Sequence, residues 1–370
     1  MGGSMFIKNK LFIVFWSLLL VSIFTSYCLA SDIQITDTLG REVGIPQEIN
    51  RILAVGCSLR EVLSFDVADK IVGIEYREKA KTDEKDAPQG SDLPYMLAFP
   101  ELYDLPVVNI GAGGSGYNHE VIVQLNPEII FMGATDIQKV DDLQHKTRIP
   151  VVTVYTNPIG TPKQDETFYQ SLKIIGEVLG KKDRAEELIN IIETYKKDLS
   201  NRTKDIPDEQ KLTAYIAGRA FYGSHGLTST DPQWPPFNWI NEPNVAYELS
   251  ELSSGVNIDK EALIGWNPEV IFISPVSLSI IENELQTSPF KELKAIQENK
   301  VYYVLPFCWY SYNKENAIVD AYYVGKTIYP DVFQDINIDQ KGVEIFKKFY
   351  GESGENAYYT LKDRFKAFSN

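Results

Sequence analysis

A segment in the second half of the chain brings a cation, a phenol, an imidazole and two hydroxyls close together in sequence. It reads RAFYGSHGLTST over residues 219–230 and follows an apolar run that we expect to form a buried strand. An arginine fork matches carboxylates and oxyanions, and a histidine can donate to an anion or ligate a metal. We predict that this segment contacts a ligand; the alternative is a turn rich in Ser, Thr and Gly. The predicted contacts are Arg219, Tyr222, His225, Ser229 and Thr230, with His225 also a candidate metal ligand.

Polar and aromatic side chains also follow the other apolar runs. Ligands of open parallel sheets bind beyond the carboxyl ends of the strands, so we expect these side chains to line the same site. In the first half of the chain they are Cys57, Ser58, Arg60, Tyr76, Gly114, Ser115, Tyr117 and Thr135. In the second half they are Trp234, Trp309, Tyr310 and Tyr312. Packing in the core is the alternative for each aromatic side chain, and the loop around Gly114 is either an anion cradle of backbone N–H groups or a flexible loop.

The chain contains one internal repeat. EVIVQLNPEIIF at residues 120–131 returns as EALIGWNPEVIF at residues 261–272. In each copy we expect a helix to stop at Asn-Pro and the proline to lead into a buried strand, so a structural corner explains the shared Asn-Pro-Glu. That corner does not explain why Glu120 and Glu261 open the two copies. For each alone, the general preference for acids at a helix N-terminus is the alternative.

Short β-branched runs that alternate with helical segments predict an α/β fold with two lobes. The predicted strands of the first lobe, which follow a small hairpin, are residues 51–56, 70–76, 106–111, 128–133 and 150–155. Those of the second lobe are residues 212–218, 244–249, 269–274 and 301–306. Between the lobes, residues 165–199 carry apolar side chains three or four apart, which predicts a long amphipathic helix with a weak point at Gly180. The expected divisions are a tag scar with signal peptide, a first lobe, a linker helix, a second lobe and a C-terminal helical tail, at residues 1–30, 31–162, 163–205, 206–345 and 346–370.

The N-terminus is typical of an export signal. Two lysines precede the apolar run LFIVFWSLLLVSIF at residues 11–24, which is shorter than the roughly 20 residues that span a bilayer. Small residues favour cleavage after Ala30. A lipid anchor at Cys28 is the alternative, although bulky Tyr27 before it disfavours that modification. We therefore expect the protein to be exported, either to the periplasm or to the outer face of the membrane.

Composition excludes several classes of function. The net charge of −15 argues against a nucleic-acid groove, which needs a basic stripe. After cleavage only Cys57 and Cys308 remain, so we expect two free thiols and no disulfide framework. The chain has three histidines and no ligand cluster at a recognisable spacing, which disfavours capture of a free metal ion. We expect no resident cofactor.

The export signal, the hairpin, the two α/β lobes, the long linker helix and the paired NPEIIF and NPEVIF segments together resemble one family. This family comprises the substrate-binding proteins of ABC importers for iron–siderophore complexes, haem and vitamin B12. The resemblance covers essentially the whole mature chain and implies a ligand between two Rossmann-like lobes joined by one rigid helix. It also implies that Glu120 and Glu261 meet arginines on a two-subunit permease, which works with a cytoplasmic ATPase.

The resemblance leaves the ligand open. Our leading expectation is a monomeric, non-enzymatic receptor that captures a metal chelate of the iron–siderophore, haem or corrinoid type. The segment HGLTST at 225–230 is also similar to a subgroup associated with metals, haem or molybdate and tungstate, so an oxyanion is the alternative. In a different class, some chelatases place His and Glu in a similar cleft, but those enzymes are cytoplasmic and the export signal argues against them.

Overall fold

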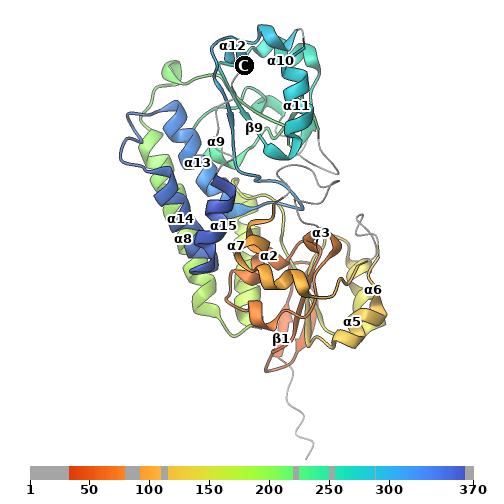
Figure 1. Cartoon of the computed structure of the whole chain (residues 1–370). Coiled ribbons are helices and arrows are strands. Elements are labelled where there is room, and N and C mark those ends of the chain that lie inside the picture. Colours follow the sequence, from red (N-terminus) through yellow and green to blue (C-terminus); the bar gives the residue numbers. More distant parts are fainter. Residues whose placement is uncertain are drawn as a thin grey trace, which may run out of the picture.

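The computed structural model describes residues 33–79, 92–109, 116–219, 225–249, 255–287 and 289–362. These residues form two α/β lobes, with long helices running along one side of both (Figure 1). Each lobe is built on a three-stranded parallel sheet, of order β3-β4-β5 in the first lobe and β10-β9-β6 in the second. The predicted fold class, two Rossmann-like lobes joined by a long helix, is confirmed.

The first lobe begins with the expected antiparallel hairpin, which turns at Gly40 with φ +76°. Its strands are β1 (Ile33–Thr36), β2 (Glu42–Ile45), β3 (Ile52–Val55), β4 (Ile129–Gly133) and β5 (Val151–Val154). Its helices include α2 (Leu59–Leu63), α3 (Tyr76–Lys79), α4 (Pro94–Ala98), α5 (His119–Leu125) and α6 (Ile137–Thr147).

The second lobe repeats this plan with a second parallel sheet and a short antiparallel pair. Its strands are β6 (Ala214–Ala217), β7 (Ser229–Thr230), β8 (Val256–Asn257), β9 (Val270–Ile273) and β10 (Val301–Tyr303). Its helices are α9 (Pro235–Trp239), α10 (Lys260–Trp266), α11 (Leu278–Leu285), α12 (Lys294–Gln297) and α13 (Lys314–Ile328).

The internal repeat supplies the central strand of each sheet, β4 and β9. Helix α5 ends at Asn126 with φ 48° and ψ 53°, and α10 ends at Asn267 with φ 46° and ψ 60°, so both asparagines adopt the left-handed conformation that stops a helix. Glu128 then accepts the backbone N–H just before β3 at 3.1 Å, and Glu269 accepts the N–H just before β6 at 3.1 Å. The Asn-Pro-Glu corner therefore has the same structural role in both lobes.

The range predicted as one linker helix, 163–205, contains two helices. Helix α7 (Pro162–Val178) packs on β1 and β5 of the first lobe, whereas α8 (Lys182–Thr203) packs on α9 and α13 of the second. The chain turns between them at Gly180, whose φ of +66° favours glycine even though a Cβ there would meet open space. Helix α8 is therefore the long helix that joins the lobes, and α7 belongs to the first lobe.

The C-terminal helices return to the first lobe. Helix α14 (Ile338–Tyr350) packs on α13 and α8, and α15 (Ser353–Leu361) packs on α14 and on α4 of the first lobe. This tail starts before residue 346, where the sequence placed its boundary. It adds a second set of contacts between the lobes beside α8, as Figure 1 shows.

Three predicted strands are not strands in the structure. Residues 70–76 and 106–109 pair only through isolated bridges, which join Ile71 to Ile52, Ile74 to Val107 and, antiparallel, Asn109 to Tyr117. Residues 110 and 111 lie outside the described residues. Residues 244–249 form a single bridge at Asn244 and then a short 3-10 turn. The other strand predictions are confirmed.

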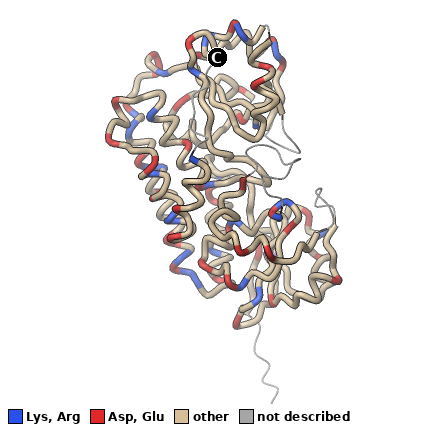
Figure 2. The backbone as a smooth tube through the Cα atoms, viewed as in Figure 1, with Lys and Arg blue, Asp and Glu red and all other residues tan. Residues whose placement is uncertain are grey.

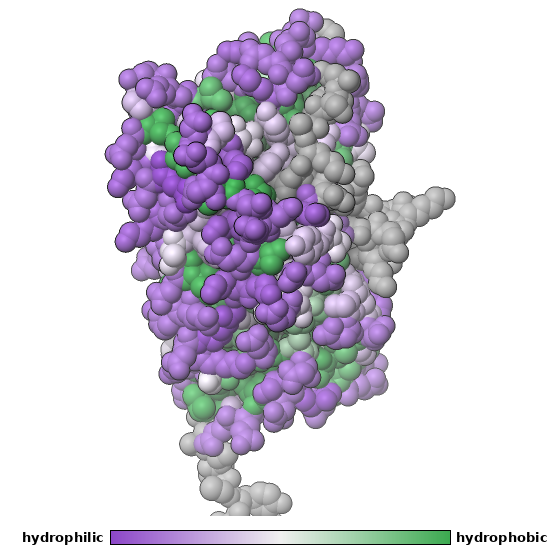
Figure 3. Space-filling view, turned by 60° about the vertical axis from the view of Figure 1, so that its left-hand side comes forward, coloured by the Kyte–Doolittle hydropathy of each residue, from purple (hydrophilic) through white to green (hydrophobic). Residues whose placement is uncertain are grey.

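Charged residues are distributed over both lobes and along the connecting helices (Figure 2). The face that carries α8 and α14 is mainly hydrophilic, with apolar residues scattered over it (Figure 3). Within the described part of the chain, none of the helices is long and apolar enough for a membrane span. The export signal and Cys28 lie outside the described residues, so both remain predictions.

Candidate ligand site between the lobes

The chain that leaves β10 crosses to the first lobe before α13 begins. Residues 308–312, which we call the strap, form a tight turn closed by an antiparallel bridge between Cys308 and Tyr312. At its tip Tyr310 has φ +48° and Ser311 has φ +75°. The left-handed region costs a residue with a side chain about 1–2 kcal/mol, and Gly or Asn usually occupies such positions in tight turns. Contacts elsewhere must therefore hold the strap in place.

Two of these contacts come from the residues on either side of Tyr310. The guanidinium of Arg77 in α3 lies over the ring of Trp309, 5.5 Å from its centroid. The hydroxyl of Ser311 donates to the backbone carbonyl of Thr156, which follows β5. The strap thus touches two separate strand ends of the first lobe.

Tyr310 itself joins the strap to two further groups of the first lobe. Its hydroxyl donates to the carboxyl group of Glu75, and its carbonyl accepts from the guanidinium of Arg60. Another nitrogen of Arg60 donates to the side chain of Asn313 at 2.7 Å, and the guanidinium lies 5.1 Å from the ring centroid of Tyr95. Arg60 is therefore buried as a link between the lobes.

Two buried carboxyl groups lie where the strap meets the first lobe. Glu75 accepts the backbone N–H of Cys57 at 3.1 Å, and Glu78 accepts the N–H of Glu75 at 2.8 Å and the hydroxyl of Tyr95 at 3.2 Å. Burial raises the pKa of Glu75; at Glu78, burial and then repulsion from Glu75 raise the pKa to about 8. Burial and the same two acids raise the pKa of the nearby Tyr117. At neutral pH this pair carries less negative charge than two exposed glutamates would.

The second lobe contributes a buried cation at the carboxyl end of β6. The Nε of Arg219 lies 3.8 Å from an Asp231 oxygen, which also accepts the hydroxyl of Tyr312 at 3.0 Å. Burial raises the pKa of Asp231 to about 6, against the opposing effect of Arg219. Burial lowers the pKa of Arg219, but Cys308, Asp231 and Tyr312 together outweigh it, so this pKa lies above its ordinary value. The hydroxyl of Ser229 donates a hydrogen bond to the backbone carbonyl of Arg219 at 2.7 Å.

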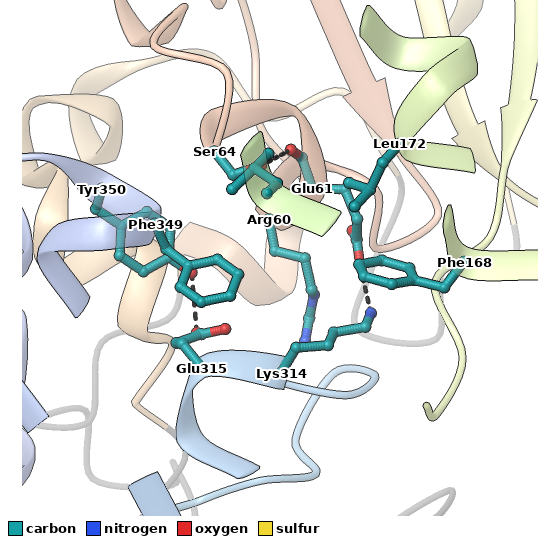
Figure 4. Close-up of a pocket in the computed structure, with 10 residues that line it drawn as sticks. Arg60, Glu61, Ser64, Phe168, Leu172, Lys314, Glu315, Phe349 and Tyr350 are labelled. Atoms are coloured by element: carbon teal, nitrogen blue, oxygen red, sulfur yellow. Dashed lines mark hydrogen bonds and ion pairs between the residues drawn. The ribbon is translucent and has the colours of Figure 1, made fainter. Parts of the chain in front are cut away.

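Beneath the junction, charged and aromatic side chains from both lobes line a cavity of about 20 Å³ (Figure 4). Glu61 of α2 forms an ion pair with Lys314 of α13, whose Nζ lies 4.8 Å from the ring centroid of Phe168. Glu315 accepts the hydroxyl of Tyr350 at 2.9 Å. The second oxygen of Glu61 is buried without a hydrogen-bond partner among the described residues, and a cavity of this size has room for about one water molecule.

The structure separates the predicted site residues into groups. At the junction of the lobes lie Cys57, Arg60, Tyr117, Arg219, Trp309 and Tyr310. Buried within strands or core are Ser58, Ser229, Thr230, Trp234 and Tyr312. Outside the described residues are Gly114, Ser115 and Tyr222.

The remaining three predicted residues lie at strand ends or in the loop after β6. Tyr76 is 44% exposed and Thr135 is exposed. His225 is partly buried, and its backbone N–H donates to the hydroxyl of Ser277 at 3.1 Å. Among the described residues, neither His225 nor any other His, Cys, Asp or Glu belongs to a group of three that could hold a metal ion. Neither Cys57 nor Cys308 forms a disulfide.

Trp234 has the role that core packing predicts for an aromatic residue. Its indole is fully buried, with its ring centroid 4.8 Å from that of Phe237 and 5.3 Å from that of Phe307. The buried hydroxyl of Ser58 likewise donates to a backbone carbonyl, that of Phe131, at 3.1 Å. Since both side chains are enclosed by the protein, we do not retain them among the proposed ligand contacts.

Sequence reasoning missed the acidic groups of the junction. Glu75 and Glu78 flank the predicted Tyr76, and Asp231 directly follows the predicted Thr230. The available signal was an acid placed at the end of a buried apolar run, where burial must be offset by hydrogen bonds or a cation. Lys314 was also missed, because only folding brings it to Glu61.

The two repeated glutamates occupy equivalent places on the surface. Glu120 lies in the first turn of α5 and Glu261 in the first turn of α10, and both side chains are exposed. Each helix has seven residues and ends at a left-handed asparagine. Val123, one turn after Glu120, is 49% exposed.

Comparisons with known proteins agree with this architecture. The chain is 24% identical over 353 residues to the molybdate-binding protein MolA of Haemophilus influenzae, covering 89% of this chain and 93% of that protein. The solved structure of MolA bound to molybdate matches with a TM-score of 0.67 and 22% identity, covering 86% of this chain and 98% of that one. The siderophore-binding protein FeuA of Bacillus subtilis, solved with ferri-bacillibactin, matches with a TM-score of 0.56 and 15% identity, covering 82% and 98%.

Residues 56–306 match the family model described as periplasmic binding protein, a range that runs from the end of β3 to just after β10. It includes β4 and β5 of the first sheet, all three strands of the second sheet and the helix α8 between them, and thus most of the architecture on which the candidate site is built. This chain belongs to the periplasmic binding protein family, whose members include substrate-binding proteins of ABC transporters.

Proposed function

We propose that this chain is the exported substrate-binding protein of an ABC importer and that its ligand is a small oxyanion of the molybdate or tungstate type. The match to a molybdate-binding protein over nearly the full length of both chains supports the ligand class. We expect binding without turnover, by a monomer that hands its ligand to a permease.

The observation that carries the proposal is Arg219. The guanidinium of this residue is buried at the carboxyl end of β6 in the second lobe, and ligands of parallel sheets bind at such strand ends. Its Nε lies 3.8 Å from an oxygen of Asp231, so an acidic side chain stands beside this cation. A guanidinium presents its donors in a planar fork, and a buried site strengthens each bond to an anion. We assign Arg219 as the main anion contact.

A metal chelate is the second candidate, because aromatic side chains also lie at the junction. Trp309 and Tyr310 are partly exposed there, and Tyr76 is 44% exposed. Aromatic walls suit a bulky or planar ligand. The chelate candidate uses these rings, whereas the oxyanion candidate depends on Arg219.

We further propose that Glu120 and Glu261 dock the protein on a two-subunit permease. They are exposed at equivalent positions of the two lobes, as a partner with two similar halves requires. An exposed ion pair is worth roughly 0.2–1 kcal/mol, so the two contacts are expected to set register and encounter rate more than affinity. The exposed Val123 adds apolar area beside one of them.

Calorimetric titration of the mature protein tests the ligand class. Molybdate, tungstate and sulfate are compared with a ferric siderophore, haem and cobalamin. We expect molybdate and tungstate to bind, and Arg219→Gln to abolish that binding. The matched control Lys139→Gln, which removes a cation that is 75% exposed on α6, is expected to leave binding unchanged. Binding of a chelate with no response to either oxyanion would select the second candidate.

A further inference from the structure

We propose that the strap determines ligand specificity: the Tyr310 side chain fills the space beyond the strand ends of the first lobe, so that a small anion is admitted and a bulky chelate is excluded. The inference deepens the proposed function, on which it rests. It assigns to this chain a residue that selects between the two ligand classes considered above.

The base of the strap is firmly anchored in the second lobe. Phe307, just before it, packs 5.3 Å from the ring of Trp234 and 5.6 Å from that of Tyr312. Asn313 follows the strap directly. Its side-chain amide donates to the carbonyl of Pro306 at 2.7 Å, and its backbone N–H donates to the carbonyl of Phe307 at 2.8 Å. The two ends of the turn therefore cannot swing away as a flexible loop would.

The tip is held just as firmly by the first lobe. Successive strap residues contact Arg77 of α3, then Glu75 and Arg60, and then the carbonyl of Thr156. These groups follow different strand or bridge segments of the first lobe, so the strap lies across several strand ends. Two adjacent non-glycine residues at left-handed φ persist only where the surroundings over-determine them. A strained and anchored turn of this kind points to a functional constraint.

The position of the phenol explains what that constraint selects. Tyr310 reaches Glu75, which is only 1% exposed, and lies near Cys57 and Glu78. A large ligand would have to displace the phenol to contact this part of the first lobe. Arg219 lies instead beside the strap's ends, near Cys308 and Tyr312, so under this proposal a small anion bound by Arg219 does not have to displace the phenol. The strap thus covers part of the first lobe, whereas the cation of the second lobe lies beside the ends of the strap.

Replacing Tyr310 tests the inference in the full-length mature protein. The variants are Tyr310→Ala and Tyr310→Gly, with Tyr310→Phe as the matched control that keeps the ring. Glycine tolerates the left-handed φ, so Tyr310→Gly removes the phenol while relieving backbone strain and is expected to fold even if the alanine variant does not. The probes are molybdate and a ferric triscatecholate complex, titrated into each protein.

We expect the native protein and Tyr310→Phe to bind molybdate and not the chelate. Tyr310→Ala and Tyr310→Gly are expected to gain chelate affinity by about tenfold or more while the Kd for molybdate changes by less than about threefold. Native protein that binds molybdate, with a folded Tyr310→Gly that still rejects the chelate, would overturn this inference alone. Native protein that binds the chelate and not molybdate would overturn both this inference and the proposed function.

Discussion

The substitution Lys314→Met leaves a carboxylate buried without its cation between the lobes. The side chains of Lys314 and Glu61 are only 3% and 2% exposed, and one Glu61 oxygen already lacks a hydrogen-bond partner among the described residues. Burial raises the pKa of Glu61 and lowers that of Lys314, so burial disfavours the charged form of each group and their mutual contact opposes it. Removing one partner of such a pair costs about 3–5 kcal/mol. We expect a loss of that size in the free energy of unfolding.

Urea unfolding at pH 7, followed by tryptophan fluorescence, measures this loss by linear extrapolation. The double variant Glu61→Gln with Lys314→Met is expected to be more stable than Lys314→Met alone, because it removes the stranded carboxylate. The matched control is Lys182→Met, whose ion pair with Glu177 is exposed on the surface and worth less than about 1 kcal/mol. A loss of less than about 1 kcal/mol for Lys314→Met would refute the reasoning, because a buried pair would then behave as an exposed one.

Three further predictions concern protons and docking. Glu78 has a pKa of about 8 in the folded chain against an ordinary 4.5, so the folded state holds this proton more tightly than the unfolded state. The free energy of unfolding should therefore fall as pH rises between these values, by at most about 1.4 kcal/mol per pH unit. Thermal melts of Glu78→Gln should show a melting temperature that depends less on pH. Asp231 has a pKa of about 6, and its protonation removes a negative charge beside Arg219, so oxyanion affinity should rise as pH falls through about 6. In calorimetry at about pH 7.5, Asp231→Asn should bind the oxyanion roughly three- to tenfold more tightly than the native protein and should lose this pH dependence. Unchanged affinity in that variant would remove Asp231 from the binding site. Reversing charge in Glu120→Lys with Glu261→Lys should reduce permease-dependent uptake while leaving ligand Kd unaltered, and unimpaired transport would exclude both from docking.

The framework of both sheets could be predicted because its signal is local. The apolar runs of β4 and β9 are bounded by Asn-Pro-Glu corners, and both central strands were located from these letters alone. The run at residues 244–249 failed for an equally local reason. The side chain of Asn244 accepts the N–H of Ala246 at 3.0 Å, which makes a turn that competes with the strand.

The linker was misjudged where a short turn interrupts two helices of similar pattern. Gly180 was recognised as a weak point, but nothing in the surrounding letters distinguishes a kink from a complete reversal of the chain. The packing of α7 on the first lobe decides that question, and such packing is not visible in a linear pattern. The return of α15 to α4 is hidden for the same reason.

Part of the candidate site depends on contacts that only the fold creates. The positions of Arg219 and Tyr310 followed from strand ends, whereas the ion pair of Glu61 with Lys314 joins residues far apart in sequence. The left-handed turn at Tyr310 and Ser311 contains neither Gly nor Asn, so no sequence rule indicates it. It forms because the first lobe holds it, and that is a tertiary effect.

The central claim, a small oxyanion held at Arg219 between the lobes, is tested most directly by locating tungsten. Crystals grown with tungstate give an anomalous signal that marks the metal without assumptions about the ligand. We predict one strong peak for the tungsten atom beside the Arg219 guanidinium, close enough for the tungstate oxygens to accept hydrogen bonds from it. This peak should lie on the side of the strap away from Glu75. A peak elsewhere, or none at a tungstate concentration that saturates binding in solution, would contradict it.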